Sequence, residues 1–508
     1  MPTRILHVRN GEAVPAAEVP LLPADDFQGL VADSLTAGAR LCAYYGAEPA
    51  GEAGAVLLTA VLANDAGGTL GLLSTRPGPS LPSLAAECPA TQLFERELAE
   101  QYGVLPAGHP WLKPVRFEHR LGGTAGDAFG RTEPWPEIPG DTPFFAVEGE
   151  EVHEVAVGPV HAGIIEPGHF RFQCHGEHVF HLEISLGYQH RAAERMLAGG
   201  PTARTVGLVE SIAGDTAVGH ALAHARAAEG LAGVEAPPRA QALRAVALEL
   251  ERLANHVGDL GMLAGDVGYL PTASFCGALR AEFLNALSEI CGNRFGRGLV
   301  VPGGVRFDLP GAAATRLAAR MADAWERVEM SVNLFFESPS VRNRTDGTGK
   351  VDRATARQLG LVGPAGRACG LLVDARRTHP FGPPAAALEP VTAEDGDVQA
   401  RALVRFGESA RSAAFVVEAL RTLPPGPVRA GPAPLRPGRL AVSLVEGWRG
   451  EICHAVSTGG DGRFARYKVV DPSFHNWMGL QLALRGEQIS DFPLCNKSFN
   501  LSYCGHDL

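Results

Sequence analysis

LRAVALELERLANHVGDLGMLAGDVG, residues 243–268, carries the clearest helical pattern of this chain. Its apolar side chains recur three and four residues apart: Leu243, Val246, Leu250, Leu253, Val257 and Leu260. This spacing places them in one stripe along a long amphipathic helix. Two prolines precede the stripe, where the start of a helix tolerates them. The polar side chains off the stripe include Glu249, Arg252, His256 and Asp259.

Similar patterns predict further long helices downstream. A second stripe runs over residues 317–335 and stops before Pro339, and residues 276–292 and about 400–421 predict two more helices. Helices with apolar stripes must cover those stripes against one another. We therefore expect a large, mainly helical domain over residues 148–508, with β-strands at its periphery.

The N-terminal part has a different pattern. AVLLTAVLAND at 55–65 and TLGLLSTR at 69–76 predict strands, because they are apolar and bounded by turn residues. ATQLFERELAEQYG at 90–103 predicts a helix that ends at Gly103. Residues 1–120 are thus expected to form a small α+β domain. The Gly- and Pro-rich residues 121–147 are expected to be a linker, and the fold class of the whole chain is α+β.

Composition excludes several functions. The chain has 508 residues and a net charge of −11, so binding to nucleic acid is not expected. No apolar run approaches the roughly 18 residues that a membrane span needs, and no signal-peptide core opens the chain. We expect a cytoplasmic protein that reaches a membrane only through partners. The nine cysteines include no CxxC pair, and neither a Walker loop nor a Rossmann fingerprint occurs.

A short loop raises the question of a lost metal. VESIAGDTAVGH, residues 209–220, contains Ala213-Gly214-Asp215-Thr216, which has the layout of a Cys-Gly-x-Cys metal loop without either cysteine. Thiolates are the soft ligands that such a loop would supply, and alanine offers no donor at all. The loop therefore predicts a retained backbone shape without its metal chemistry.

Four segments carry a resemblance to a known family. The large-domain motifs are GPVHAGIIEPGHFRFQCHGEHVFHLEISLGYQHRAAERM (158–196), LELERLANHVGDLGMLAGDVG (248–268) and WRGEICHAV…NLSYCGHDL (448–508). They resemble the catalytic large subunit of membrane-bound, energy-converting NiFe hydrogenases, and its homologue in complex I that lines the quinone site. Residues 90–114 resemble the small complex I subunit that is fused to the large subunit in formate hydrogenlyase. The resemblance covers nearly the whole chain.

The resemblance also shows where this chain departs from the hydrogenases. It places the four nickel-binding cysteines at Ala213, Thr216, Ser502 and Gly505, and none of them is cysteine here. Cys504 lies one residue out of register. We therefore expect no NiFe centre and no metal ligands in this chain. The resemblance implies that an iron–sulfur cluster sits in a partner like the hydrogenase small subunit, and that a quinone is a possible ligand.

Three acidic or basic residues become candidates for proton transfer. Glu166 and His169, in EPGHFRF, match a Glu-x-His pattern whose glutamate passes protons in the hydrogenases. A salt-bridged structural glutamate is the alternative of equal weight. Asp266 matches an acidic residue that is linked to a quinone-site histidine in complex I, and a helix cap or turn is its alternative.

Four further residues become candidates for binding. His161 matches a histidine at the start of the same complex I motif, and His220 has the register of the histidine after the cysteine loop. The second quinone histidine and its tyrosine partner would fall near Pro167 and Gly214, so both polar groups are missing. Gly214 keeps the turn of the loop. Arg367, in RACGLLVDAR, could position an anionic head group, although structural ion pairing is the favoured role.

Three functions are compatible with these residues. The first is a redox subunit that passes electrons from the partner cluster to a quinone-like or other small acceptor. The second is a coupling or scaffold subunit without a substrate, which links the iron–sulfur partner to antiporter-like membrane subunits at the inner face of the cell membrane. The third, ranked last, is a hydrogenase with an altered metal site. The short tail after Tyr503 also predicts that the C-terminus is not processed.

Overall fold

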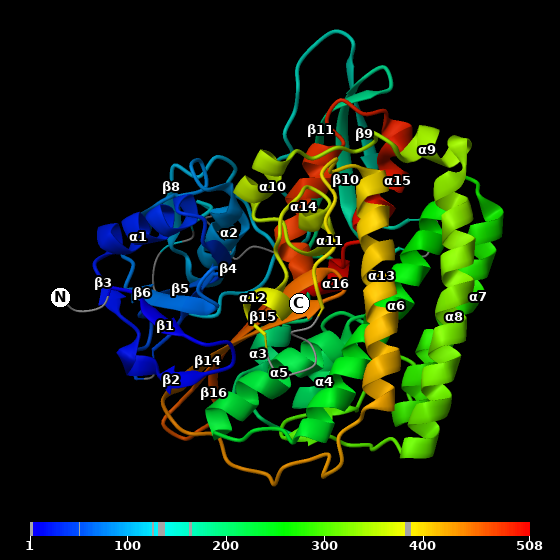
Figure 1. The fold of residues 1–508 in the computed structure, drawn as a ribbon. Helices are drawn as coiled ribbons and strands as arrows, with labels where there is room; N and C mark the ends of the chain where they lie inside the picture. The colour runs from blue at the N-terminus through cyan, green and yellow to red at the C-terminus, as the bar shows by residue number, and fades with distance from the viewer. Residues whose placement is uncertain are drawn as a thin grey trace.

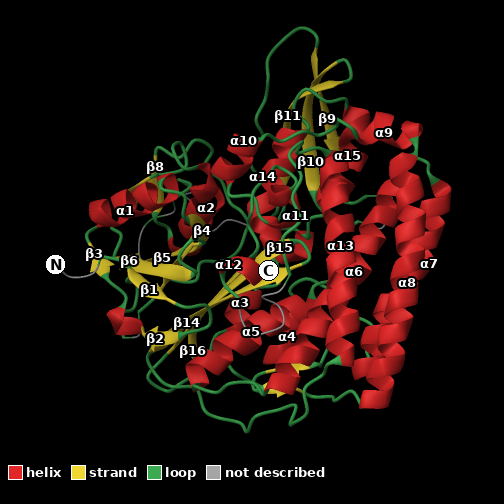
Figure 2. Ribbon diagram, viewed as in Figure 1, coloured by secondary structure: helices red, strands yellow, loops and turns green. Residues whose placement is uncertain are grey.

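The computed structural model describes residues 4–49, 51–123, 126, 128–130, 138–161, 165–380 and 388–508. Figure 1 shows the N-terminal part on one side of the molecule and a bundle of long helices on the other, with sheet strands between them. Figure 2 shows a second, smaller group of strands that projects above the bundle. The mixed α+β class that the sequence predicts is confirmed.

The N-terminal part is built around one mixed sheet. Its strands follow the order β1-β6-β5-β4, and β3 pairs in parallel with β6. The predicted strands are β5 and β6, and the predicted helix is α2, which ends at Gly103 with φ of 70°. The elements are β1 (Leu6–Val8), β2 (Ala13–Pro15), β3 (Leu21–Leu22), α1 (Ala24–Thr36), β4 (Arg40–Ala47), β5 (Leu57–Asn64), β6 (Thr69–Thr75), β7 (Ser80–Pro82), α2 (Gln92–Tyr102) and β8 (Leu105–Ala107).

Four long helices form the bundle. The helical stripes correspond to α6 (Pro238–Asp266), α7 (Leu270–Cys291), α8 (Gly311–Glu337) and α13 (Val398–Arg421), so these helix predictions are confirmed. They lie side by side in both ribbon views. The shorter helices are α3 (Ala193–Leu197), α4 (Thr205–Glu210), α5 (Ala217–Ala232), α9 (Pro339–Thr345), α10 (Arg353–Leu359), α11 (Gly363–Arg367), α12 (Ala375–Thr378), α14 (Pro472–Ala483), α15 (Phe492–Phe499) and α16 (Tyr503–Asp507).

Helix α6 differs from the expected amphipathic helix in one respect. The apolar stripe is buried as predicted, but Glu249, Arg252, His256 and Asp259 are buried as well. Their charges are balanced by groups from other elements, which makes their burial tolerable. The polar side of α6 therefore faces the interior of the protein and not the solvent.

The strands of the large part occupy two different places. β9 (Val152–Val157), β10 (His169–His175) and β11 (His178–Ser185) form the projecting sheet. β14 (Arg439–Gly447), β15 (Gly450–Thr458) and β16 (Phe464–Val470) are almost fully buried, so they are not peripheral as expected. A two-stranded ladder joins β12 (Val300–Val301) to β13 (Gly304–Val305). The buried sheet is central because both the helices and the N-terminal part pack on it.

The N-terminal part and the buried sheet are continuous. β2 pairs with β14, with Val14 opposite Leu440. One apolar core contains N-terminal residues such as Phe27 and Leu62 together with Leu444 of β14. Part of the expected linker 121–147 lies outside the described residues, and its described residues form no helix or strand. No described helix is long and apolar enough to cross a bilayer.

The docking of β2 generates a first prediction. A Cβ atom at Gly230 of α5 would overlap the carbonyl oxygen of Gly11, which precedes β2. We expect Gly230→Ala to destabilise the fold by about 1–3 kcal/mol, because the overlap forces the two segments apart. Gly207→Ala is the matched control, since Gly207 is helical and exposed and has nothing within 4 Å of its Cβ position. Thermal unfolding measures the melting temperatures of Gly230→Ala and Gly207→Ala. Equal melting temperatures of the two variants would contradict the prediction.

Candidate functional site

Three distant segments meet at one junction, which we define by Glu166, Gly214, Ser502, Tyr503 and Cys504. A carboxylate oxygen of Glu166 accepts a hydrogen bond from the backbone N–H of Tyr503, at 3.2 Å. The thiol of Cys504 contacts the Glu166 carboxylate and the backbone N–H of Gly214. Its sulfur also lies 3.4 Å from the hydroxyl of Ser502. The structure thus brings two predicted site residues, Glu166 and Gly214, to the same cysteine.

Arg191 links two of the segments that meet at the junction. Its guanidinium donates to the carbonyl oxygens of Ile212, at 2.9 Å, and Cys504, at 3.3 Å. The residue after α16 also holds Arg191, whose backbone N–H donates to the carbonyl of Leu508 at 2.9 Å. One arginine therefore ties the loop before α5 to the C-terminal helix.

The donor set of the junction does not fit nickel. Ser502 accepts the backbone N–H of Gly505 at 2.9 Å and caps α16, and the hydroxyl of Thr216 donates to Asp215 at 3.1 Å. Cys504 is the one thiol of the defined junction, where a NiFe centre needs four, and in the metal-free protein burial and the nearby Glu166 raise its pKa to about 11. Among the described residues, no group of three or more His, Cys, Asp or Glu side chains could hold a metal.

A bidentate ion pair holds the loop 213–216 in place. Arg449 donates to both carboxylate oxygens of Asp215, at 2.6 and 2.7 Å. Burial opposes ionisation of Asp215, but the charge and hydrogen bonds of Arg449 outweigh it and keep the pKa of Asp215 below its usual range. Arg449 also donates to the carbonyl of Asn500, at 2.5 Å, and Trp448 donates to the carbonyl of Asp215, at 3.1 Å. The turn between β14 and β15 is thereby joined to the loop and to the C-terminal segment.

A buried carboxyl group from α6 caps the next helix. Glu251 accepts the backbone N–H groups of Val218, at 2.7 Å, and Gly219, at 3.0 Å, in the first turn of α5. Burial raises the pKa of Glu251 to about 8, although these two hydrogen bonds act in the opposite direction. The sequence pattern places Glu251 on a helix without indicating this role.

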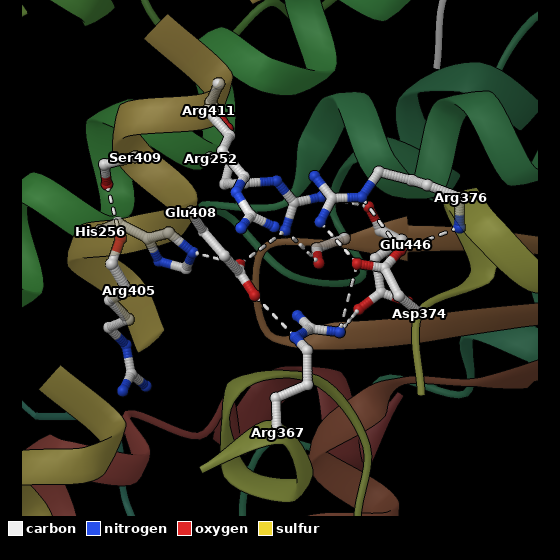
Figure 3. Close-up of polar contacts among 12 residues, drawn as sticks. Arg252, His256, Arg367, Asp374, Arg376, Arg405, Glu408, Ser409, Arg411 and Glu446 are labelled. Atoms are coloured by element: carbon white, nitrogen blue, oxygen red, sulfur yellow. Dashed lines mark hydrogen bonds and ion pairs between the residues drawn. The ribbon is translucent and has the colours of Figure 1, made fainter. Parts of the chain in front are cut away.

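Arg367, a predicted binding residue, lies in a buried network of charges (Figure 3). Its guanidinium contacts Glu408 at 2.6 Å, Glu446 at 2.7 Å and Asp374 at 3.5 Å. These partners come from α13, from β14 and from the residue that caps α12. Arg367 is fully buried, and its guanidinium also donates to the carbonyl oxygen of Val373 at 2.7 Å.

The network continues along α6. Arg376 contacts Asp374 at 2.6 Å and Glu249 at 3.2 Å, and Arg252 contacts Glu249 at 3.0 Å. Figure 3 shows the side chain of His256 pointing toward Glu408, which lies 3.0 Å from its Nε2. Burial lowers the pKa of His256 to about 4, so the neutral ring donates from Nε2. Burial also raises the pKa of Glu446 to about 7.

His220, another predicted binding residue, begins a chain of buried polar rings. Its Nε2 lies 3.0 Å from Asp471 and its Nδ1 lies 3.1 Å from Nε2 of His454. The hydroxyl of Tyr467 lies 2.9 Å from Nδ1 of His454 and 2.9 Å from Nδ1 of His224. Asp471 anchors this chain and also caps α14.

The remaining predicted residues lie outside the junction's hydrogen bonds. His161 binds the carbonyl of Gly168 through Nε2, at 2.9 Å. His169 is fixed as a neutral ring, because Arg171 donates to its Nε2 at 3.2 Å and its Nδ1 lies 3.2 Å from the carbonyl of Gly158. Residues 162–164 are outside the described part. Within the described part, no hydrogen bond links Glu166 to either histidine.

Asp266 is the last residue of α6 and forms an ion pair. One of its carboxylate oxygens lies 2.5 Å from the ammonium nitrogen of Lys497 in α15, and the other is buried without a hydrogen-bond partner in the described chain. Asp266 thus joins the end of α6 to the segment that precedes the junction. The sequence alone did not indicate Lys497 as its partner.

Comparisons with known proteins agree on one family. Residues 266–438 match the family model described as "Respiratory-chain NADH dehydrogenase, 49 Kd subunit". The carbon monoxide-induced hydrogenase of Rhodospirillum rubrum is 31% identical over 351 residues, which are 68% of this chain and 97% of that protein. Formate hydrogenlyase subunit 5 of Escherichia coli K12 is 30% identical over 434 residues, which are 84% of this chain and 76% of that protein.

A solved structure shows the same fold. A chain in the structure of the membrane-bound sulfane sulfur reductase, an archaeal respiratory membrane complex, aligns with a TM-score of 0.66 at 24% identity. The alignment covers 70% of this chain and 99% of that chain.

The raised pKa of Glu251 generates a second prediction. A glutamate in the unfolded chain has a pKa of 4.5, so the unfolded chain releases the proton of the Glu251 carboxyl above that pH. The folded protein keeps this proton up to about pH 8. Stability therefore falls as the pH rises through this window, by about 1.4 kcal/mol per pH unit. We expect Glu251→Gln to remove this slope, because the amide does not titrate.

The measurement is the melting temperature of both proteins between pH 5 and 8. The wild type should lose stability relative to Glu251→Gln as the pH rises. The exposed Glu418 on α13 offers a matched Glu→Gln control, whose curve should run parallel to the wild type. If the melting temperature of Glu251→Gln also changes with pH in parallel with the wild type, Glu251 does not hold a proton in the folded protein over this range and the prediction is wrong.

Proposed function

This chain belongs to the family of membrane-bound hydrogenase large subunits and 49-kDa respiratory NADH dehydrogenase subunits, and we propose that it acts as a redox subunit without a NiFe centre. It is a subunit of a hydrogenase- or complex I-like assembly, as its relatives indicate. We propose that it passes electrons from an iron–sulfur cluster in a partner to a quinone-like or other small acceptor. The partner would resemble the hydrogenase small subunit.

The junction carries this proposal. Glu166 contacts the C-terminal helix directly, and the only sulfur in the defined junction belongs to Cys504, whose raised pKa keeps it protonated. Such a site can hold and move a proton at a carboxylate oxygen, but it lacks the thiolates that nickel would require. Proton transfer beside an electron acceptor is the chemistry that remains available to these residues.

The surrounding residues would keep the junction in shape. The pair Asp215–Arg449 fixes the loop, and Glu251 fixes the helix that follows it. Within this proposal, a reduced acceptor takes its proton from Glu166, which is then reprotonated from water. The acceptor itself would lie beside the segment 158–170, the loop 210–220 and the C-terminal tail.

A coupling subunit without a substrate is the alternative. The buried charge network supports it, because it links α6, α11, α13 and β14 into one unit that could transmit force between partners. In both proposals the chain is cytoplasmic and peripheral at the inner face of the cell membrane, and antiporter-like membrane subunits hold it there. A hydrogenase with an altered metal site is ranked last, because the donor set does not fit nickel.

A third prediction separates the first two proposals. In the native complex, Glu166→Gln should lower the reduction of an added quinone by about 100-fold or more, because the amide cannot carry the proton. The amide oxygen can still accept the N–H of Tyr503, so the fold should persist. Glu177→Gln, in the exposed hairpin between β10 and β11, is the matched control. Unchanged turnover in Glu166→Gln would favour the coupling subunit.

A fourth prediction concerns the metal. Elemental analysis of the native complex should find iron but no stoichiometric nickel, and Cys504→Ser should change neither the metal content nor quinone reduction. A serine at this position can keep the contacts to Glu166 and Ser502. Stoichiometric nickel that disappears in Cys504→Ser would instead establish an altered metal site.

A further inference from the structure

A cavity with a volume of about 490 Å³ lies outside the junction. It is bounded by residues 92–115 of the N-terminal part, by strand β11 and by α14. Its apolar walls are largely flat or flexible side chains: Trp111, Phe145, Trp477, Met478 and Leu482. This size and this lining are typical of sites for small organic ligands.

More cationic than anionic side chains line the cavity. Among the described residues that line it, Arg96, Lys113 and Arg485 are cationic and Glu183 is the only carboxylate. Glu183 is already engaged, because it forms an ion pair with Lys113 and accepts the indole N–H of Trp111 at 3.0 Å. Two positive charges are therefore left without a carboxylate from the walls.

Arg96 forms no salt bridge with a described carboxylate, although Glu100 and Glu183 lie near enough to act on its charge. It donates to the backbone carbonyls of Lys113 and Pro114, both at 2.7 Å, which fixes the guanidinium without neutralising it. Burial lowers the pKa of Arg96 to about 10, although the negative charges of Glu100 and Glu183 act in the opposite direction. Arg485 is exposed at the same cavity, and no described acidic side chain pairs with it.

Trp477 adds an unused donor to the same wall. Its side chain is 2% exposed, and its indole N–H has no acceptor in the described chain. A buried donor without an acceptor is costly and uncommon in native structures. The ring packs edge-on against Tyr503, with centroids 4.9 Å apart, so the cavity adjoins the junction.

We propose that this cavity binds a small organic anion that carries an apolar planar ring. The ring lies against Trp111, Phe145 and Met478. The anionic group is placed between Arg96 and Arg485 and accepts the N–H of Trp477. An anionic group at this place pairs with two cations that form no salt bridge in the described chain and supplies an acceptor for the unused indole N–H, and the aromatic walls favour an apolar body. The site is independent of the function proposed for the junction.

The test compares two probes of equal shape and different charge. The purified full chain is titrated calorimetrically with 2-naphthoate and with neutral 2-naphthalenemethanol. We expect 2-naphthoate to bind at least about tenfold more tightly, because only the anion is attracted by the two arginines. Equal affinities, or no binding of 2-naphthoate at millimolar concentration, would overturn the proposal.

Variants locate the binding. Arg485→Met should weaken 2-naphthoate about tenfold and leave the neutral probe unchanged. The exposed Arg316→Met on α8 removes the same charge far from the lining residues and should change neither affinity. Trp477→Phe keeps a ring and removes only the N–H, so it should weaken the anion about fivefold. If Arg316→Met weakens 2-naphthoate as much as Arg485→Met does, the attraction is a general surface effect and the proposal is wrong.

Discussion

Charge neutralisation in the interior holds the helical bundle and the central sheet together. Arg252, Arg367 and Arg376 are buried with carboxylates from α6, α13 and β14 around them. Removing one partner of such a pair leaves an uncompensated buried charge, which costs about 3–5 kcal/mol. These elements can therefore pack only in the arrangement that satisfies every charge. The turn after β14 carries Arg449, so the same arrangement also brings Arg449 to Asp215.

Apolar periodicity predicted the long helices well, because burial of a stripe depends on residues that are close in sequence. It could not predict the surroundings of the polar side of α6. The partners of His256 and Arg252 lie on α13 and β14, between 150 and 200 residues away along the chain. When the partner of a buried charged residue is so far away along the chain, the sequence around that residue looks the same as the sequence around a charged residue that faces water. The buried position of β14–β16 was missed for the same reason, since the N-terminal part covers it only in the folded chain.

The candidate site was predicted in part. The resemblance to the hydrogenases implied that the segment with Glu166, the loop with Gly214 and the C-terminal tail lie around one site, and the structure joins them through Tyr503 and Cys504. The ion pair of Asp215 with Arg449 and the cap formed by Glu251 were not predicted. These roles depend on the direction of single side chains, which neither spacing nor composition specifies. Lys497 was missed as the partner of Asp266 because the two residues are 231 positions apart.

The loss of four thiolates changes the electrostatics of the junction as well as its ligands. Ser502 and Thr216 now satisfy hydrogen bonds of the protein itself, so their hydroxyls are engaged in caps and turns. The remaining thiol, Cys504, is protonated because burial and Glu166 both raise its pKa. Of the carboxyl groups near the loop, Asp215 is already neutralised by Arg449, and Glu251 is engaged by the backbone N–H groups of Val218 and Gly219. A negative charge that arrives at this junction therefore acts most strongly on Glu166, whose hydrogen-bonded contacts are a backbone N–H and a thiol rather than a cation.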